Sequence, residues 1–285
     1  MATNQQRREA AKRKLERQLV HRAERAKRRR NVGIGVTIGA VIAVAGAIWL
    51  IVATNGSDST GTQASATPTK PPEIKIPTQR AEAVKRPTAL ANPISCEFKA
   101  EADRPASKPA KAPANGNVAS TGTVNATLKS TAGDIKITLD RSLAPCAVES
   151  FISLAKQGYF TDTECHRLST EGLQMLQCGD PTAKGTGGPG YSFKDEVFPE
   201  LKYGRGVLAM ANSGPDTNGS QFFMVYGDAG LPPNYTVFGS ISDEGLQVLD
   251  KVARAGIDPS SAATSQDGTG KPVTPVKFTA VSVEG

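Results

Sequence analysis

The residues most capable of chemistry lie in three short segments of the second half of the chain. The first is Cys165-His166-Arg167-Leu168, which is followed, ten residues after the arginine, by Gln177. A glycine-rich segment spans 185–190, and residues 208–223 read LAMANSGPDTNGSQFF. An arginine stays charged at every working pH and presents several N–H donors in one rigid plane. Without a cofactor, it could stabilise a lone pair that appears only in a transition state.

Other chemistries need partners that this sequence does not supply. A Ser-His-Asp hydrolase would have to use His166, and there is no G-x-S-x-G motif. Residues 185–190 have the spacing of a dinucleotide-binding loop, but no apolar strand precedes them and Pro189 lies inside the pattern. The cysteines form no CxxC pair, which argues against zinc. We therefore expect no metal and no cofactor, and we interpret 185–190 as a loop beside a groove.

Alternating apolar and polar residues predict eight short strands around these segments. Their approximate ranges are 124–128, 135–139, 164–168, 173–178, 206–211, 220–226, 235–241 and 276–281. Two helices are expected, one from Pro145 to Gly158 and one at about 243–254. Many short strands joined by Gly/Pro turns are typical of a barrel or a sandwich.

Taken in this order, the three segments resemble the cyclophilin family. Residues 208–223 are close to a signature of that family, and residues 235–239 (YTVFG) are similar to its next strand. The resemblance covers about residues 122–283. It implies a mainly β fold, an eight-stranded antiparallel barrel capped by two helices, which agrees with the elements counted above.

The resemblance also implies an activity, the cis-trans isomerisation of peptide bonds before proline. Amide resonance sets a rotation barrier of about 18–20 kcal/mol, and the prolyl nitrogen regains its lone pair only when the bond is twisted. A donor fixed beside that lone pair stabilises the twisted state more than either planar state. By the resemblance, Arg167 is this donor, Gln177 orients it and the substrate carbonyl, and Asn212 holds the peptide backbone.

Further residues are assigned to substrate binding by the same resemblance. They are His166, Met175, Ala211, Gln221, Phe223, Leu231 and Tyr235. The sequence departs from the family pattern in several places: the usual pocket phenylalanine is not visible near Leu173 or Gln174, and Gly230 or a gap falls where the family often has a tryptophan. The spacing from Arg167 to Gln177 is two residues longer than in the well-known eukaryotic members, and Tyr235 stands where the family often has a histidine. We expect an altered hairpin before Gln177 and a more open rim of the proline pocket.

The first part of the chain is organised differently. Residues 1–30 carry 12 Lys/Arg and 3 Asp/Glu, so the net charge of +7 comes from this tail, which argues against a nucleic-acid-binding domain. Residues 32–54 are uncharged and long enough to cross a bilayer as one helix. The basic tail, 1–31, predicts that the N-terminus is cytoplasmic. A cleaved signal peptide is the rival interpretation.

We therefore expect a single-pass protein of the cell membrane. A flexible Pro/Ala-rich linker, 55–120, would carry an isomerase domain, 121–285, on the extracytoplasmic side. The domain would act as a monomer on proline-containing polypeptides, during the folding of exported or membrane proteins. Two alternatives stay open: a binding module with incidental catalysis, and a structural protein whose basic tail docks a cytoplasmic partner.

All four cysteines follow the apolar segment: Cys96, Cys146, Cys165 and Cys178. An even number in an oxidising compartment suggests two disulfides, for which three pairings are possible. If the His-Arg strand and the Gln strand form a hairpin, Cys165 and Cys178 lie near its open end. We favour that bond, together with one from Cys96 to Cys146 that would tie part of the linker to the first helix.

Overall fold

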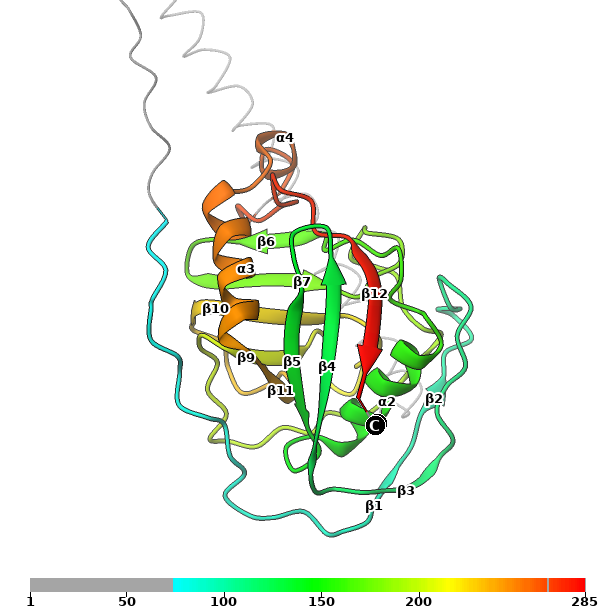
Figure 1. The fold of residues 1–285 in the computed structure, drawn as a ribbon. Helices are drawn as coiled ribbons and strands as arrows, with labels where there is room; N and C mark the ends of the chain where they lie inside the picture. Colours follow the sequence, from blue (N-terminus) through cyan, green and yellow to red (C-terminus); the bar gives the residue numbers. More distant parts are fainter. Residues whose placement is uncertain (1–73, 266, 285) are drawn as a thin grey trace, which may run out of the picture. The chain divides into compact units, whose positions relative to one another are not determined.

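A computed structural model of the chain describes residues 74–265 and 267–284 (Figure 1). The basic tail, the apolar segment expected to cross the membrane and the start of the expected linker lie outside these residues. Within the described part, no helix combines the length and the apolar character that a bilayer-spanning segment needs.

An antiparallel sheet of eight strands, in the order β12-β4-β5-β11-β9-β10-β7-β6, forms most of the domain. Its strands in chain order are β4 (Thr123–Ser130), β5 (Ile135–Asp140), β6 (Arg167–Ser169), β7 (Leu173–Cys178), β9 (Val207–Met210), β10 (Phe222–Ala229), β11 (Val237–Ile241) and β12 (Phe278–Val283). Both ends of every strand lie within three residues of the predicted boundaries. The alternation in the sequence therefore predicts these eight strands correctly.

The sheet curls, but its outer strands β6 and β12 are not paired as neighbours. The segment before β6 joins them instead, because Cys165 N donates to Val276 O over 2.9 Å and Phe278 N donates to Thr163 O over 2.9 Å. β6 is three residues long, too short to run along the six residues of β12. The barrel that we expected is therefore a curled sheet whose edges are linked by isolated backbone hydrogen bonds.

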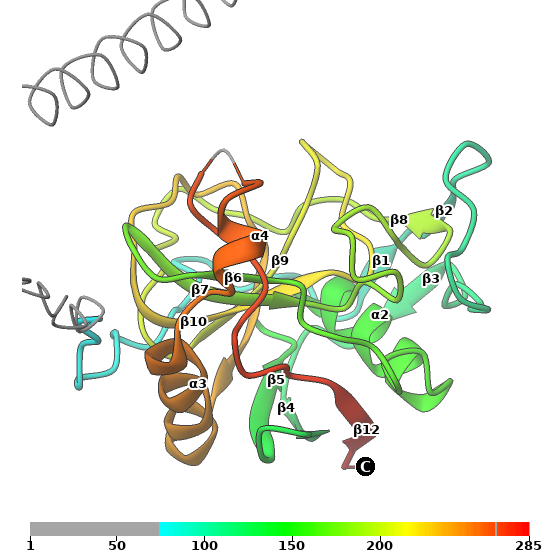
Figure 2. The same cartoon turned by 90° about the horizontal axis from the view of Figure 1, so that it is seen from above.

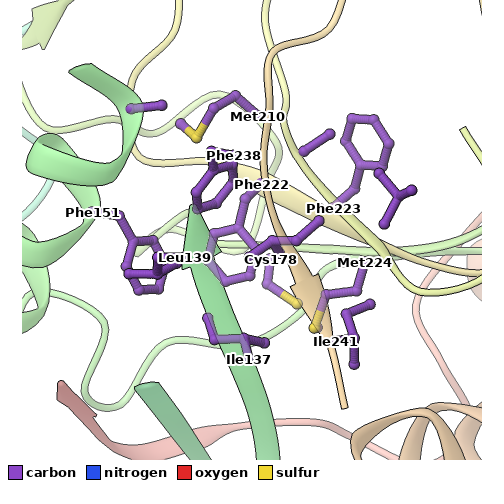
Figure 3. Close-up of a cluster of buried hydrophobic side chains, with 14 of the residues drawn as sticks. Ile137, Leu139, Phe151, Cys178, Met210, Phe222, Phe223, Met224, Phe238 and Ile241 are labelled. Atoms are coloured by element: carbon purple, nitrogen blue, oxygen red, sulfur yellow. The ribbon is translucent and has the colours of Figure 1, made fainter. Parts of the chain in front are cut away.

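One face of the sheet is packed into an apolar core. Phe222 of β10 is fully buried, and its ring lies edge-on to that of Phe151 with the centroids 5.5 Å apart. Figure 3 shows these two rings in one cluster with Phe238 of β11. Because successive side chains of a strand point to opposite faces, Phe223 belongs to the other face, where the candidate site lies.

The two predicted helices flank the β4–β5 hairpin on opposite sides (Figures 1 and 2). Helix α2 (Pro145–Lys156) begins with a proline, which lacks the N–H that the first turn leaves unpaired. Helix α3 (Asp243–Ala255) begins after Ser242, whose hydroxyl accepts a hydrogen bond from Gly245 N over 3.0 Å. A short helix, α4 (Pro259–Ala262), follows α3.

Residues 74–120, which we name the strap, do not form the flexible linker expected there. Two of its short strands, β1 (Ile94–Cys96) and β3 (Gly116–Val118), pair with each other, and β2 (Lys99–Ala100) pairs with β8 (Tyr191–Ser192). The strap passes along the lower edge of the sheet in Figure 1. Its composition predicts disorder because it holds few large apolar residues, but specific contacts order it.

A disulfide and one arginine fix the strap to the domain. Cys96 is bonded to Cys146 of α2, as we favoured from the sequence. Arg86 Nε donates to Leu143 O over 2.8 Å, and its Nη2 donates to Glu196 O over 2.7 Å. The same guanidinium lies 4.8 Å from the centre of the Phe198 ring, an arrangement that favours a cation.

Candidate active site

The register of neighbouring strands brings Arg167, Gln177 and Phe223 into one row. Arg167 of β6 is directly opposite Gln177 of β7, and Gln177 is directly opposite Phe223 of β10. Directly opposed residues point to the same face of a sheet, so the three side chains share the outer face. The turn between β6 and β7 contains Gly172, which adopts φ +68°, and the altered hairpin expected from the spacing stays a prediction.

A chain of side-chain hydrogen bonds runs from Arg167 across the site. Arg167 Nη1 donates to Gln177 Oε1 over 3.3 Å, and Gln177 Nε2 donates to Gln221 Oε1 over 2.9 Å. Gln221 Nε2 then donates to the backbone oxygen of Gly187 over 2.9 Å. Because an arginine can only donate, it sets the orientation of both amides in turn. Three of the predicted site residues therefore form one directed network.

The glycine-rich segment is a loop that Asp180 holds in place. The buried Asp180 carboxylate accepts hydrogen bonds from Thr182 N over 2.7 Å and from Lys184 N over 3.2 Å. Burial alone would raise the pKa of this carboxyl, but hydrogen bonds from Thr182 and from the backbone of Gly187 hold the pKa below its usual value. A Cβ on Gly187 would lie only 2.0 Å from Asp180 Oδ1, so only glycine fits there.

Four predicted residues line one groove of about 480 Å³, which we name the glycine-loop groove: Gln177, Ala211, Asn212 and Gln221. Its other walls are the loop at 185–189 and part of the strap, 101–105. Asn212 Nδ2 donates to Asn234 O over 2.9 Å, so its side chain ties two loops at the rim. The contribution of the strap to this wall was not predicted.

Arg167, His166 and Gln177 line a second groove of about 460 Å³, which we name the arginine groove. Gln177 lies at the boundary of both grooves. The His166 ring is largely buried, and neither ring nitrogen has a hydrogen-bond partner among the described residues. Burial lowers the pKa of His166, so the ring is neutral at pH 7. This side chain packs beside the arginine and offers no charge to a ligand.

The expected apolar pocket residues lie beside the row and line neither groove. Met175 and Phe223 are 1% and 4% exposed. The Phe223 ring lies edge-on to Tyr235, with centroids 5.6 Å apart, and both Tyr235 and Leu231 are partly buried. Phe223 lies opposite Gln177 in the β7–β10 pairing, and Met175 lies two residues before Gln177 on the same face of β7. The more open rim expected from Tyr235 stays a prediction.

Two residues that the sequence reasoning missed hold Arg167 from the side opposite Gln177. Arg167 Nε donates to Thr269 Oγ1 over 2.9 Å, and Arg167 Nη2 forms a 2.8 Å ion pair with Asp267 Oδ2. The sequence gives only a weak signal for them. Asp267-Gly268 is a turn pair, but no periodicity connects it to an arginine 100 residues earlier.

The second disulfide closes the hairpin that carries Arg167 and Gln177. Cys165 is bonded to Cys178, with their Cα atoms 4.0 Å apart, which confirms the favoured pairing. The described residues contain no free cysteine. They also contain no group of three or more His, Cys, Asp or Glu side chains arranged to hold a metal ion.

Comparisons with known proteins agree with this geometry. Residues 123–283 match the family described as "Cyclophilin type peptidyl-prolyl cis-trans isomerase/CLD". A "Probable peptidyl-prolyl cis-trans isomerase B" of Mycobacterium leprae is 50% identical over 178 residues, 58% of this chain and 60% of the relative. Its Mycobacterium tuberculosis counterpart is 46% identical over 204 residues, 67% of this chain and 64% of the relative.

The matched region therefore spans less than two thirds of the length of these curated relatives. Among solved structures, a cyclophilin-type isomerase of Cryptosporidium parvum is 33% identical, with a TM-score of 0.49 over 57% of this chain and 99% of that chain. The family match covers more than half of the chain and includes every predicted catalytic and substrate-binding residue. The chain belongs to the cyclophilin-type peptidyl-prolyl cis-trans isomerase family.

Proposed function

We propose that this chain accelerates rotation about X-Pro bonds, with Arg167 as the catalytic donor. One observation carries the proposal. Three of the five N–H groups of the Arg167 guanidinium are engaged, by Thr269, Gln177 and Asp267. One N–H on each terminal nitrogen is left without a partner in the described part of the chain, at the edge of the arginine groove.

Charge and rigidity suit this guanidinium to the reaction. As the amide twists, conjugation is lost and the prolyl nitrogen regains a lone pair that accepts a hydrogen bond. A fixed cationic donor stabilises that lone pair without reorganising during the reaction. Each factor of ten in rate requires about 1.4 kcal/mol. A charge-assisted hydrogen bond made only in the twisted state supplies one to two such factors, since it is worth about 1.5–3 kcal/mol.

The other site residues bind and orient the peptide in this proposal. Gln177 lies at the boundary of the two grooves, where it can reach the substrate carbonyl beside the proline while it holds Arg167. Asn212 and Ala211 line the glycine-loop groove, where an extended backbone would lie. The proline ring would pack against the apolar rim formed by Phe223 and Tyr235.

We also propose where the enzyme works. The apolar segment 32–54 and the basic tail before it support a single-pass anchor with the isomerase domain outside the cytoplasm. Two disulfides suit an oxidising compartment. The substrates would be proline-containing segments of exported or membrane proteins, and the domain would act as a monomer. Protease accessibility of the domain in intact and in permeabilised cells tests this location: protection in intact cells would contradict it.

The activity is tested by measuring isomerisation of a proline-containing peptide with the full chain. Arg167→Ala should lower kcat/KM by about a hundredfold, the order expected on removing one preorganised donor. Arg80→Ala, which removes an exposed arginine of the strap, is the matched control and should keep the wild-type rate. Equal rates for Arg167→Ala and wild type, or peptide binding without acceleration, would favour the binding module instead.

A further inference from the structure

Residues 256–265 and 267–273 belong to the connection between α3 and β12, which we name the C-terminal loop. Its base is closed by hydrogen bonds from Asp258 N to Lys271 O over 2.8 Å and from Val273 N to Gly256 O over 2.9 Å. Its far arm lies along β6, because Leu168 and Gly270 exchange backbone hydrogen bonds of 2.6 and 3.1 Å. In Figure 1 the loop and α4 lie beside β6. The strand that carries Arg167 thus has this loop as its outer neighbour.

The loop presents Thr269 and Asp267 to two different nitrogens of Arg167. Thr269 Oγ1 donates its single proton to Asp267 Oδ1 over 2.7 Å. The threonine oxygen can therefore only accept from Arg167 Nε, which it does at 2.9 Å. Asp267 Oδ2 accepts from Nη2 of the same guanidinium over 2.8 Å. The donor and the acceptor are therefore fixed in each hydrogen bond among Arg167, Thr269 and Asp267, as they are in the bonds from Arg167 through Gln177 to Gln221.

Asp267 is itself held in a single orientation. Its Oδ1 accepts hydrogen bonds from Ser265 Oγ over 2.5 Å and from Thr269 N over 3.2 Å, in addition to the threonine hydroxyl. These donors, first the hydroxyls of Ser265 and Thr269, hold the pKa of Asp267 well below its usual range. The carboxylate is therefore charged at neutral pH, and its other oxygen, Oδ2, accepts the hydrogen bond from Arg167.

We propose that Asp267 and Thr269 are positioning residues for Arg167, which fix the guanidinium so that its remaining N–H groups face the substrate. The inference rests on the proposed function, because it assigns these residues an effect on catalysis through Arg167. A hydrogen bond to Gln177 alone would hold only Nη1 of Arg167. The guanidinium plane could then still rotate about that hydrogen bond. The two loop contacts, on Nε and Nη2, remove this rotation and define which two N–H groups stay available.

The expected effect is on rate and not on stability. The Asp267 side chain is 55% exposed in its ion pair with Arg167, and exposed ion pairs contribute little to folding. Misplacement of a catalytic group by about 1 Å can nevertheless cost up to a hundredfold in rate. A purely structural role would show the opposite pattern, with lower stability and an unchanged kcat.

The chain offers a matched control in a second exposed arginine–aspartate pair. Arg80 and Asp243 are also 2.8 Å apart but lie away from both grooves. The assay uses the full chain and a proline-containing peptide. Asp267→Ala should lower kcat about tenfold at nearly unchanged KM, which is less than the hundredfold that a misplacement of about 1 Å can cost. Thr269→Val should lower kcat severalfold, Asp267→Glu should restore part of the rate, and Asp243→Ala should match wild type.

Two further measurements separate this proposal from the proposed function. The Nε–Hε resonance of Arg167 should shift in Thr269→Val and in Asp267→Ala but not in Asp243→Ala. The factor lost on Asp267→Ala should shrink in an Arg167→Lys background, since lysine has no planar guanidinium to orient. Wild-type or higher kcat in Asp267→Ala, while Arg167→Ala is inactive, would overturn the positioning role and leave the function intact. Full activity of Arg167→Ala would overturn both.

Discussion

The eight-stranded sheet and the strap are neighbours in one domain, but they are stabilised by different means. In the sheet, continuous registers such as the six residue pairs from Thr123 to Leu128 against β5 place one face in the core. In the strap, the paired strands are two or three residues long, and Cys96 and Phe98 are its buried apolar residues. A disulfide, single arginine contacts and side-chain hydrogen bonds order the rest.

This difference determines what each region contributes to the site. The sheet positions Arg167, Gln177 and Phe223 through backbone register, which one substitution can hardly shift. The strap contributes a groove wall, at 101–105, whose position depends on a few separate contacts. We therefore expect damage to the sheet to unfold the domain. Damage to the strap should release one wall of the glycine-loop groove, while the row of Arg167, Gln177 and Phe223 stays assembled.

The largest effect is expected for Phe222→Ala in the core of the sheet. The Phe222 ring is fully buried and packs against Phe151 and, at 5.8 Å between centroids, Phe160. Truncation of a buried phenylalanine costs about 3–5 kcal/mol because it removes contacts and leaves a cavity. Urea denaturation should show this loss as one cooperative transition. A loss below about 1 kcal/mol would contradict the view that this cluster sustains the sheet.

Removal of the disulfide of the strap should cost less and act more locally. Cys96 and Cys146 are 50 residues apart, and a bond that closes a loop of this size is worth about 2–4 kcal/mol. In the double Cys96→Ser/Cys146→Ser variant, hydrogen exchange should become fast around 92–120 but stay slow in β7 and β10. Equal loss of protection in both regions would show that the strap and the sheet form one cooperative unit.

Arg86→Ala should loosen the strap by an intermediate amount. The substitution removes the hydrogen bonds from the guanidinium to the backbone oxygens of Leu143 and Glu196. It also removes the contact between the guanidinium and the Phe198 ring. We expect a loss of about 1–3 kcal/mol, the range for hydrogen bonds made by a charged group. Arg80→Ala breaks only an exposed ion pair and should cost less than about 1 kcal/mol. Thermal denaturation of both variants ranks them, and equal losses would refute the special role of Arg86.

The smallest effect concerns pH at the junction of the two regions. Burial raises the pKa of Glu196 to about 7, although its carboxylate accepts hydrogen bonds from Cys146 N and Ala147 N. Between about pH 4.5 and 7 the folded protein keeps a proton that the unfolded chain has released. The free energy of unfolding should therefore fall as pH rises through this window.

The size of that fall should be roughly 1–2 kcal/mol, less than the full shift implies because the side chain is partly exposed. Glu196→Gln should abolish it, and Glu200→Gln, on an exposed neighbour, should keep the wild-type dependence. His166 contributes with the opposite sign, because burial lowers its pKa in the folded protein. The comparison of wild type with Glu196→Gln cancels that contribution. An unchanged slope in Glu196→Gln would contradict the assignment.

The same contrast explains which parts of the structure the sequence could predict. Residues 135–139 alternate strictly, and the strand found there is Ile135–Asp140, because burial of one face enforces a period of two. The resemblance also implies that Gln177 orients Arg167, and the structure places the two residues opposite each other in neighbouring strands. Residues near such periodic segments were therefore placed correctly.

Residues fixed by single long-range contacts could not be placed in this way. Arg86 in a Pro/Ala-rich stretch has no pattern that indicates a bond to a carbonyl 57 residues away. Asp267 and Thr269 belong to a loop whose only local signal is a turn. The predicted barrel was only partly correct. The eight antiparallel strands form a curled sheet, and the segment before β6, and not β6 itself, bonds to Val276 and Phe278.

The pairing of Gly270 with Leu168 has a consequence for the outer edge of the sheet. An outer strand with free backbone groups can recruit an extended polypeptide as an additional strand. Here the C-terminal loop already occupies the outward N–H and C=O of Leu168. The C-terminal loop thus keeps another extended chain from pairing with this edge of the sheet beside Arg167.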